Sequence, residues 1–225
     1  MKTLIVPDIH LQWPVADAII SLVKADRVVL LGDYFHNWND TPEENAEMAR
    51  WVKKNIDNYT FLLGNHDAAH FYSISCSGWT KAKDEVIKDI LPQEYWGQFK
   101  FFESIDGWLL THAGLTKQWV PESLEPKDVI SWLEDEVKYA VKTPFNSWVF
   151  AVGRMRCGAA PQGGILWTDR REFIPIPGVK QIFGHMHLTE PVWFNEHNVG
   201  IDTNLSHCTI LEDGRLEVKE TRKLS

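Results

Sequence analysis

Cysteine is scarce in this sequence of 225 residues. The three cysteines, Cys76, Cys157 and Cys208, are widely separated, and none belongs to a CxxC pair. An odd and scattered set of this kind predicts neither a disulfide framework nor a zinc–thiolate site. We therefore expect three free thiols, as is usual in a reducing compartment.

Long hydrophobic runs are also missing. No apolar stretch approaches the roughly 18 residues that a membrane-spanning helix needs. The N-terminal segment MKTLIVPDIH has one lysine and a short apolar run that gives way to Asp8 and His10, which does not fit a secretory leader. These features predict a cytoplasmic protein without membrane association.

A third absence is an excess of positive charge. The chain has 31 acidic and 23 basic residues, so its formal net charge is −8. Non-specific affinity for nucleic acid depends on many contacts of Lys and Arg with phosphate, and we therefore expect no stable nucleic-acid binding. A small phosphorylated substrate or a phosphopeptide remains compatible with this charge, because bound metal ions can invert the local charge.

The sequence contains no internal repeat, low-complexity tract or linker-like segment, so we expect one domain over residues 1–225. Short runs rich in Val, Ile, Leu and Phe indicate buried strands. These runs are TLIV (3–6), RVVLL (27–31), YTFLL (59–63), GWLLT (107–111) and VKQIF (179–183). Helical patterns over 14–25 and 41–56 separate the first three runs, and this alternation predicts an α/β fold with parallel strands and right-handed crossovers.

The remaining segments predict further elements. Apolar spacing indicates helices over 80–91 and 125–141. The tail from residue 192 onward has the alternation of antiparallel strands, and Asp213-Gly214 is a strong hairpin turn. We expect these last strands to complete a second sheet packed on the first.

Each of the five apolar runs is followed closely by Asp, Asn or His. Parallel strands place their carboxyl ends on one edge of a sheet, where ligands bind in open α/β folds, so we expect these side chains to converge. The convergent set is Asp8, His10, Asp33, Asn65, His66, His112, His185 and His187. Carboxylates, an amide and imidazoles without a thiolate favour Mn²⁺, Fe, Zn²⁺ or Ni²⁺ over Ca²⁺. Without His66, seven ligands are still too many for one tetrahedral ion and suit a pair of ions roughly 3.5–4 Å apart that share one carboxylate.

These blocks resemble, in order, the motifs of the calcineurin-like metallophosphoesterases. The blocks are D-x-H (8–10), G-D (32–33), G-N-H-D (64–67), H-A-G (112–114) and G-H-x-H (184–187). The resemblance spans residues 1 to about 205. It implies a four-layer αββα sandwich of two mixed sheets flanked by helices, in agreement with the strand pattern, and a single metallophosphoesterase domain.

The resemblance also implies a ligand set for two divalent ions, with Mn²⁺ the expected metal. One ion would be held by Asp8, His10 and His187 and the other by Asn65, His112 and His185, with Asp33 bridging both. The implied reaction is in-line attack on phosphorus by a hydroxide that bridges the metals. His66 would protonate the leaving oxygen, the neighbouring carboxylate Asp67 is a second catalytic candidate, and Asn65 would also contact the phosphate.

Two departures concern how the phosphate is handled. In the protein phosphatase branch the second block reads G-D-x-x-D-R, whereas here it reads GDYFHN, with His36 for the Asp and Asn37 for the Arg. His36 is therefore a catalytic candidate that would hydrogen-bond the substrate. Arg170 in ILWTDRRE is the first candidate for phosphate binding, because a guanidinium binds phosphate in a bidentate manner. Lower-ranked candidates are Arg171, Arg154 and Arg156 for the phosphate and His70 for lining the site.

The sequence thus predicts a dinuclear-metal phosphoesterase, most simply a phosphatase of phosphomonoesters similar to the serine/threonine phosphatases. Asn37 in place of the arginine keeps two alternatives open, a dinucleoside-polyphosphate hydrolase and a phosphodiesterase or nuclease. An alternative of another class is a catalytically silent binding module on the same fold.

Overall fold

The computed structural model describes residues 1–74 and 76–224. The helices are α1 (Trp13–Val23), α2 (Pro42–Asn55), α3 (Asn65–Phe71), α4 (Lys81–Ile90), α5 (Gln93–Trp96) and α6 (Val129–Lys142). The strands are β1 (Lys2–Val6), β2 (Arg27–Leu30), β3 (Thr60–Phe61), β4 (Phe102–Ile105), β5 (Trp108–Thr111), β6 (Lys180–Phe183), β7 (Val192–Asn195), β8 (Asn198–Gly200), β9 (His207–Glu212) and β10 (Arg215–Glu220).

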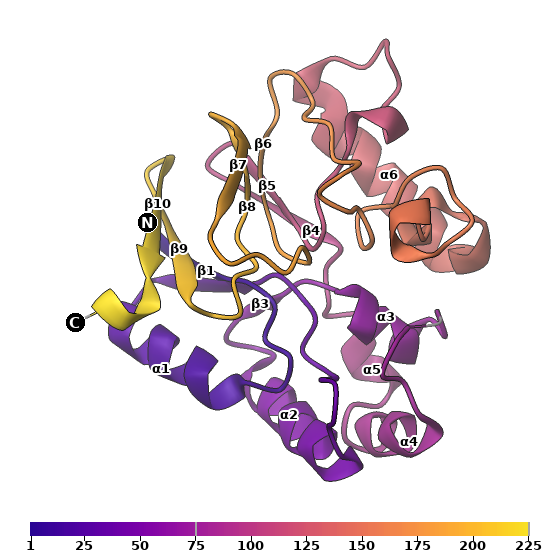
Figure 1. The fold of residues 1–225 in the computed structure, drawn as a ribbon, viewed down its shortest axis with the longest axis vertical. Coiled ribbons are helices and arrows are strands. Elements are labelled where there is room, and N and C mark those ends of the chain that lie inside the picture. Colours follow the sequence, from indigo (N-terminus) through magenta and orange to yellow (C-terminus); the bar gives the residue numbers. More distant parts are fainter. Residues whose placement is uncertain (75, 225) are drawn as a thin grey trace.

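The strands form two mixed sheets of five strands each, which confirms the predicted α/β class. The first sheet has the order β10-β9-β1-β2-β3 and the second the order β4-β5-β6-β8-β7. Helices α1 and α2 lie on the outer side of the first sheet, and α6 lies at the far side of the second (Figure 1). The sheets are thus the two inner layers of the molecule.

Side-chain alternation along the strands explains this layering. In β1, Leu4 and Val6 belong to a core cluster that also contains the buried residues of α1 and α2. Ile5 between them belongs to a second cluster, which joins strands of both sheets and includes Leu110 of β5 and Ile182 of β6. Because successive residues of a strand point to opposite faces, an uninterrupted apolar run is buried on both faces.

Helix α2 shows how local sequence sets an element's bounds. Its N-cap residue Thr41 accepts a hydrogen bond from the Glu44 amide at 3.3 Å, and the Glu44 carboxylate accepts one from the Thr41 amide at 2.7 Å. This reciprocal capping box satisfies amides that the helix leaves without partners. Pro42 occupies the first turn, where its missing N–H costs nothing. The helix therefore begins where the sequence predicts.

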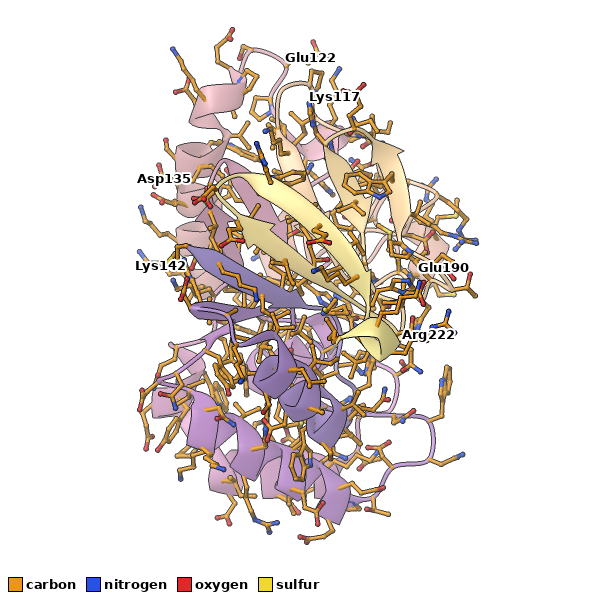
Figure 2. The ribbon with its side chains drawn as sticks, turned by 90° about the vertical axis from the view of Figure 1, so that its left-hand side faces the viewer. Lys117, Glu122, Asp135, Lys142, Glu190 and Arg222 are labelled. Atoms are coloured by element: carbon orange, nitrogen blue, oxygen red, sulfur yellow. The ribbon has the colours of Figure 1, made fainter. Side chains whose placement is uncertain are left out.

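Two features of the strand prediction were wrong. The five apolar runs do not share one edge of one sheet, since three belong to the first sheet and two to the second. The final hairpin does not complete a second sheet, because β9 pairs antiparallel with β1 and extends the first (Figure 2). The Asp213-Gly214 turn itself joins β9 to β10, with φ of 49° and 77°. In the second sheet it is β7 and β8 of the tail that add strands.

Several helices are shorter than their patterns suggest. Helix α1 ends at Val23 because Lys24 adopts a left-handed conformation with φ of 48°. In the predicted helix 125–141, the first turn is a 3₁₀ segment over Pro126–Asp128.

All three cysteines are free thiols, as predicted. Across the described residues, no helix combines the length and the apolar character that a membrane span requires.

Candidate metal centre

The predicted ligands lie in the segments that follow strands of both sheets. Asp8 and His10 follow β1, Asp33 follows β2, and Asn65 is the first residue of α3. His112 follows β5, and His185 and His187 follow β6. The site is therefore built where the carboxyl ends of β1, β2, β5 and β6 face one another across the sandwich.

The carboxylate of Asp33 belongs to two groups of three potential metal ligands. One group is Asp8, His10 and Asp33, and the other is Asp33, His112 and His185. Within each group the ligand atoms lie within 4.8 Å of one another. A carboxylate common to two adjacent groups is the arrangement that a pair of ions needs.

The contacts around His112 fit a bound cation. Its Nδ1 lies 3.0 Å from the carbonyl oxygen of Leu31, which accepts the ring proton. Nε2 of the neutral ring is therefore unprotonated, and it lies 2.9 Å from Oδ1 of Asn65, another acceptor. Two acceptors at this distance repel each other unless a cation satisfies both. Burial lowers the pKa of His112 and so keeps its ring neutral, which is the form that binds metals.

His10 is oriented in the same way. Its Nδ1 lies 2.9 Å from the carbonyl oxygen of His36, and its Nε2 lies 3.8 Å from Oδ2 of Asp33. A backbone carbonyl that holds one ring nitrogen fixes the tautomer and leaves the other nitrogen for a metal. His187 belongs to neither group of three, but its ring stacks on that of His10 with centroids 5.9 Å apart. The backbone amide of His187 donates to Asp202 at 2.7 Å.

Charge in the centre is unbalanced without cations. Burial and the carboxylates of Asp202 and Asp33 raise the pKa of Asp8 well above its usual range. Burial also raises the pKa of Asp33, but His112 and the other surrounding imidazoles lower it further, to well below its usual range. The raised pKa of Asp8 shows that a second negative charge beside Asp33 is unfavourable here, and a divalent cation between the two carboxylates would remove this repulsion.

Several residues of the centre have a positive backbone φ, which residues with a side chain rarely adopt. His10, Asp33, His185 and His187 have φ of 42°, 51°, 67° and 42°. Such left-handed residues cost of order 1–3 kcal/mol each and persist only where the surrounding structure imposes them. Gly64 is required for a different, steric reason, since a Cβ there would lie 2.2 Å from Oδ1 of Asp33.

His66 adjoins the centre, and its ring partner is another imidazole, that of His36. Its amide donates to Oδ1 of Asp33 at 2.9 Å. Its ring Nδ1 lies 3.0 Å from Nδ1 of His36, and its ring meets that of His10 edge to face at 5.2 Å. Burial lowers the pKa of His66 to about 4, although Asp33 opposes this shift. His36 is buried too, and burial together with His70 lowers its pKa to about 3.

Asp67 has a structural position rather than the catalytic one expected of it. Its carboxylate is fully buried and accepts hydrogen bonds from the amides of Gly64, Asp33 and Tyr34 at 2.8–3.0 Å. These three bonds tie the loop after β2 to the start of α3. Asp67 therefore positions Asp33 and Asn65, and its oxygens are already committed to the backbone.

The arginine against the centre is Arg156. It donates to the carbonyl oxygen of His185 at 3.2 Å and pairs with Asp169 at 2.9 Å. Arg170, the first candidate from the sequence, is exposed, and no contact recorded among the described residues joins it to the centre. Arg171 instead pairs with Asp169 at 2.7 Å. Spacing could not separate these arginines, because they lie on two loops that meet only in the fold.

Three further side chains lie near the site, those of Cys76, His70 and Asp84. Only His70 was a candidate from the sequence. Cys76 lies with His36 and His66 in a further group of three whose ligand atoms are within 4.8 Å. Burial raises the pKa of the Cys76 thiol, which disfavours the thiolate that binds metals. Asp84, whose carboxylate lies 2.8 Å from Nδ1 of His70, had no signal in the sequence, where it is one acid among several on a helix.

Comparisons with known proteins identify the family and support the fold. The sequence profile of the calcineurin-like phosphoesterases matches residues 1–188. A search of curated proteins found no match.

Among solved structures, the fold resembles a cold-active protein-tyrosine phosphatase of a psychrophile, Shewanella sp., with a TM-score of 0.61, 15% identity and coverage of 98% of this chain and 78% of that chain. It also resembles a protein serine/threonine phosphatase from Saccharomyces cerevisiae, with a TM-score of 0.57, 14% identity and coverage of 98% and 80%. A putative diadenosine tetraphosphatase has a TM-score of 0.55, 16% identity and coverage of 97% and 93%. These identities support the fold, and the profile match over most of the sequence shows that the chain belongs to the calcineurin-like phosphoesterase family.

Proposed function

We propose that this protein is a phosphoesterase dependent on two divalent metal ions, and that it hydrolyses phosphate monoesters. The observation that carries the proposal is the position of Asp33 in both groups of three ligands. A pair of ions sharing one carboxylate uses every donor of the centre. The expected substrate is a small phosphorylated molecule or a phosphopeptide.

The ligands divide between the two ions as the family resemblance implies. Asp8, His10 and His187 would hold one ion, and Asn65, His112 and His185 the other, with Asp33 common to both. The donor set of carboxylate, amide and imidazole suits Mn²⁺ and also admits Fe, Zn²⁺ and Ni²⁺. When bound, such ions lower the pKa of water and neutralise charge on phosphoryl oxygens.

The protein's own residues contribute proton transfer and phosphate binding. His66 is placed to give a proton to the leaving oxygen, because Nδ1 faces His36 and Nε2 has no hydrogen bond recorded among the described residues. Arg156 lies against the backbone of His185 and is the candidate for binding a phosphate oxygen. This replaces Arg170 as the preferred arginine.

The test is hydrolysis by protein purified without added metal. Turnover of p-nitrophenyl phosphate should appear on addition of Mn²⁺, reach a plateau at two ions per chain, and disappear after chelation. Asp33→Asn should abolish both metal binding and turnover. Asp135→Asn makes the same change at an exposed carboxylate and should change neither. Absence of turnover with full metal occupancy would favour the silent binding module.

A second candidate is hydrolysis of a diester or a dinucleoside polyphosphate. Two observations favour it: Asn37 occupies the position of the phosphate-binding arginine, and one fold neighbour, a putative diadenosine tetraphosphatase, is matched over 93% of its length. Bis-p-nitrophenyl phosphate and diadenosine tetraphosphate, each compared with p-nitrophenyl phosphate, distinguish the candidates. A higher kcat/KM for either one would replace the monoesterase proposal.

A further inference from the structure

Behind the metal centre, three imidazoles and a carboxylate form a continuous chain of hydrogen bonds. Nδ1 of His66 lies 3.0 Å from Nδ1 of His36. Nε2 of His36 lies 2.9 Å from Nε2 of His70, and Nδ1 of His70 lies 2.8 Å from Oδ1 of Asp84. We call this set the histidine chain. None of its members belongs to the seven proposed metal ligands.

The fold holds the histidine chain in place from three sides. His66 and His70 are one helical turn apart in α3 and so share one face of the helix. His36, in the loop after β2, lies between their two rings. His36 and His70 are almost fully buried, with 1% and 0% of their surface exposed. Asp84 comes from α4 and is partly buried, with 15% of its side chain exposed.

The neighbouring charges are paired in ways that leave Asp84 as an anion. Lys88 donates to its second carboxylate oxygen at 2.8 Å, and this hydrogen bond and that from His70 lower the pKa of Asp84 against the effect of burial. Lys83, also on α4, is bound to Asp40 at 2.9 Å and to the carbonyl oxygen of Gly78. The carboxylate of Asp84 can therefore only accept a hydrogen bond from the ring of His70.

Because Asp84 can only accept a hydrogen bond, the position of every proton in the histidine chain is determined. A neutral imidazole carries one N–H and one bare nitrogen. If His70 donates from Nδ1 to Asp84, its Nε2 is bare and must accept from Nε2–H of His36. Nδ1 of His36 is then bare and must accept from Nδ1–H of His66. Nε2 of His66 is left as the atom that exchanges a proton with the substrate.

We propose that Asp84, acting through His70 and His36, positions His66 and selects the tautomer with its proton on Nδ1. This rests on the proposed function of the centre. Nε2 of His66 takes up a proton from water, and Asp84 stabilises the resulting imidazolium through the two intervening rings, as an aspartate does for the histidine of a serine protease. When the bond from phosphorus to the leaving oxygen breaks, the Nε2 proton moves to that oxygen, its electron pair stays on Nε2, and His66 returns to the neutral tautomer with its proton on Nδ1.

The same atoms allow one rival interpretation, a third metal site. His36, His66 and Cys76 offer ligands within 4.8 Å of one another. In that case Nδ1 of both rings would be bare and would bind the ion instead of sharing a proton. Metal stoichiometry separates the two interpretations, because a third ion would be lost in Cys76→Ser, whereas the histidine chain does not need the thiol.

The experiment compares two monoesters that differ in how much the leaving oxygen needs a proton. p-Nitrophenolate is a weak base and leaves with little protonation, whereas the phenolate of phenyl phosphate is a stronger base. Loss of a well-placed general acid, worth roughly 10²–10⁴ in rate, therefore appears mainly with phenyl phosphate. The variants are Asp84→Asn and His70→Gln. Asp89→Asn makes the same change at an exposed acid of the same helix and is the matched control.

We expect Asp84→Asn and His70→Gln to lower kcat for phenyl phosphate about tenfold or more. Their kcat for p-nitrophenyl phosphate should fall by no more than about twofold, with KM and the two bound metals unchanged. Asp84→Glu should restore most of the lost rate, and Asp89→Asn should resemble the wild type. Equal losses with both substrates, or losses together with metal content, would overturn the proposal in favour of a structural role.

A second measurement does not depend on activity. The ¹⁵N shifts of the His66 ring, recorded on metal-free and on Zn²⁺-loaded protein, report which nitrogen carries the proton. The wild type should show a protonated Nδ1, and Asp84→Asn and His70→Gln should show a mixture of tautomers. An Nε2 proton in the wild type, or unchanged spectra in both variants, refutes the histidine chain. Failure of the wild type to hydrolyse either ester would instead refute the proposed function.

Discussion

The two halves of the metal centre differ in how deeply they are enclosed. The half formed by Asn65, His112 and His185 is buried, with 2%, 0% and 5% of each residue exposed. In the other half, 17% of the His10 side chain and 66% of the His187 side chain are accessible. The enclosed half has its ligands fixed by packing and hydrogen bonds, whereas the open half keeps one ligand at the surface. We therefore expect the enclosed half to bind its ion more tightly and the open half to receive the substrate.

The largest effect should follow from removing the ligand that both halves share. Asp33→Ala should lose metal from both halves and lower kcat/KM by about a thousandfold or more, because charge stabilisation by metals is usually the largest contribution to such reactions. The measurement is metal analysis alongside turnover of p-nitrophenyl phosphate. Retention of one tightly bound ion by Asp33→Ala would show that the halves are independent.

A residue outside both halves provides the contrast. His66→Ala should lower kcat for phenyl phosphate by roughly 10²–10³ because the leaving oxygen loses its proton donor, while both ions remain bound. Steady-state kinetics and metal analysis on the same sample test this. Full activity in His66→Ala would show that the leaving oxygen takes its proton from another source.

The enclosed and open halves can be compared directly by removing one imidazole from each. His187→Ala should lower the affinity for the more weakly bound ion by more than about tenfold and leave the affinity for the other ion unchanged. Loss of a hydrogen-bond partner of a metal ligand has an effect of comparable size. His112→Ala should weaken the tighter ion. Titration calorimetry with Mn²⁺ or Zn²⁺ measures both affinities. The comparison fails if His187→Ala affects the tighter ion.

The smallest effect concerns the stability of the metal-free protein in acid. The pKa of His36 is lowered to about 3 in the folded state, whereas an unfolded histidine has about 6.5. Between these pH values, His36 binds a proton in the unfolded chain but not in the folded protein. The free energy of unfolding therefore has its full value above about pH 6.5 and declines as the pH falls below that value. At about pH 5 the expected loss is about 2 kcal/mol.

Urea unfolding at about pH 7.5 and about pH 5 measures this loss. The His36→Gln variant should lack it, while His197→Gln, a change at an exposed histidine, should retain it. An unchanged pH dependence in His36→Gln would show that the buried imidazole is not the group that titrates.

Local sequence predicted the elements well where local physics governs them. The cap of α2 at Thr41 and the turn at Asp213-Gly214 depend on residues within four positions of each other. The motif blocks identified the family because each places its polar residues directly after an apolar strand. In contrast, the sheet to which β9 belongs depends on a pairing with β1 across some 200 residues, and no local pattern specifies it.

The candidate site shows the same division. The type and order of the seven potential ligands could be read from the sequence, and the structure brings Asp8, His10, Asp33, Asn65, His112 and His185 into contact as two groups around Asp33. Asp67 was expected to be catalytic because it follows His66, but adjacent helical residues point in different directions, and its carboxylate binds backbone amides instead.

The sequence alone therefore determined the family, the apolar strands and the set of polar residues that follow them, because strand burial and motif order are properties of contiguous residues. Only the tertiary structure decided which arginine lies against the centre and which partner holds His66. The contacts of Arg156 with His185, and of His70 with Asp84, join separate loops and helices. Such contacts exist only once the sandwich has closed and burial has forced polar groups to find partners.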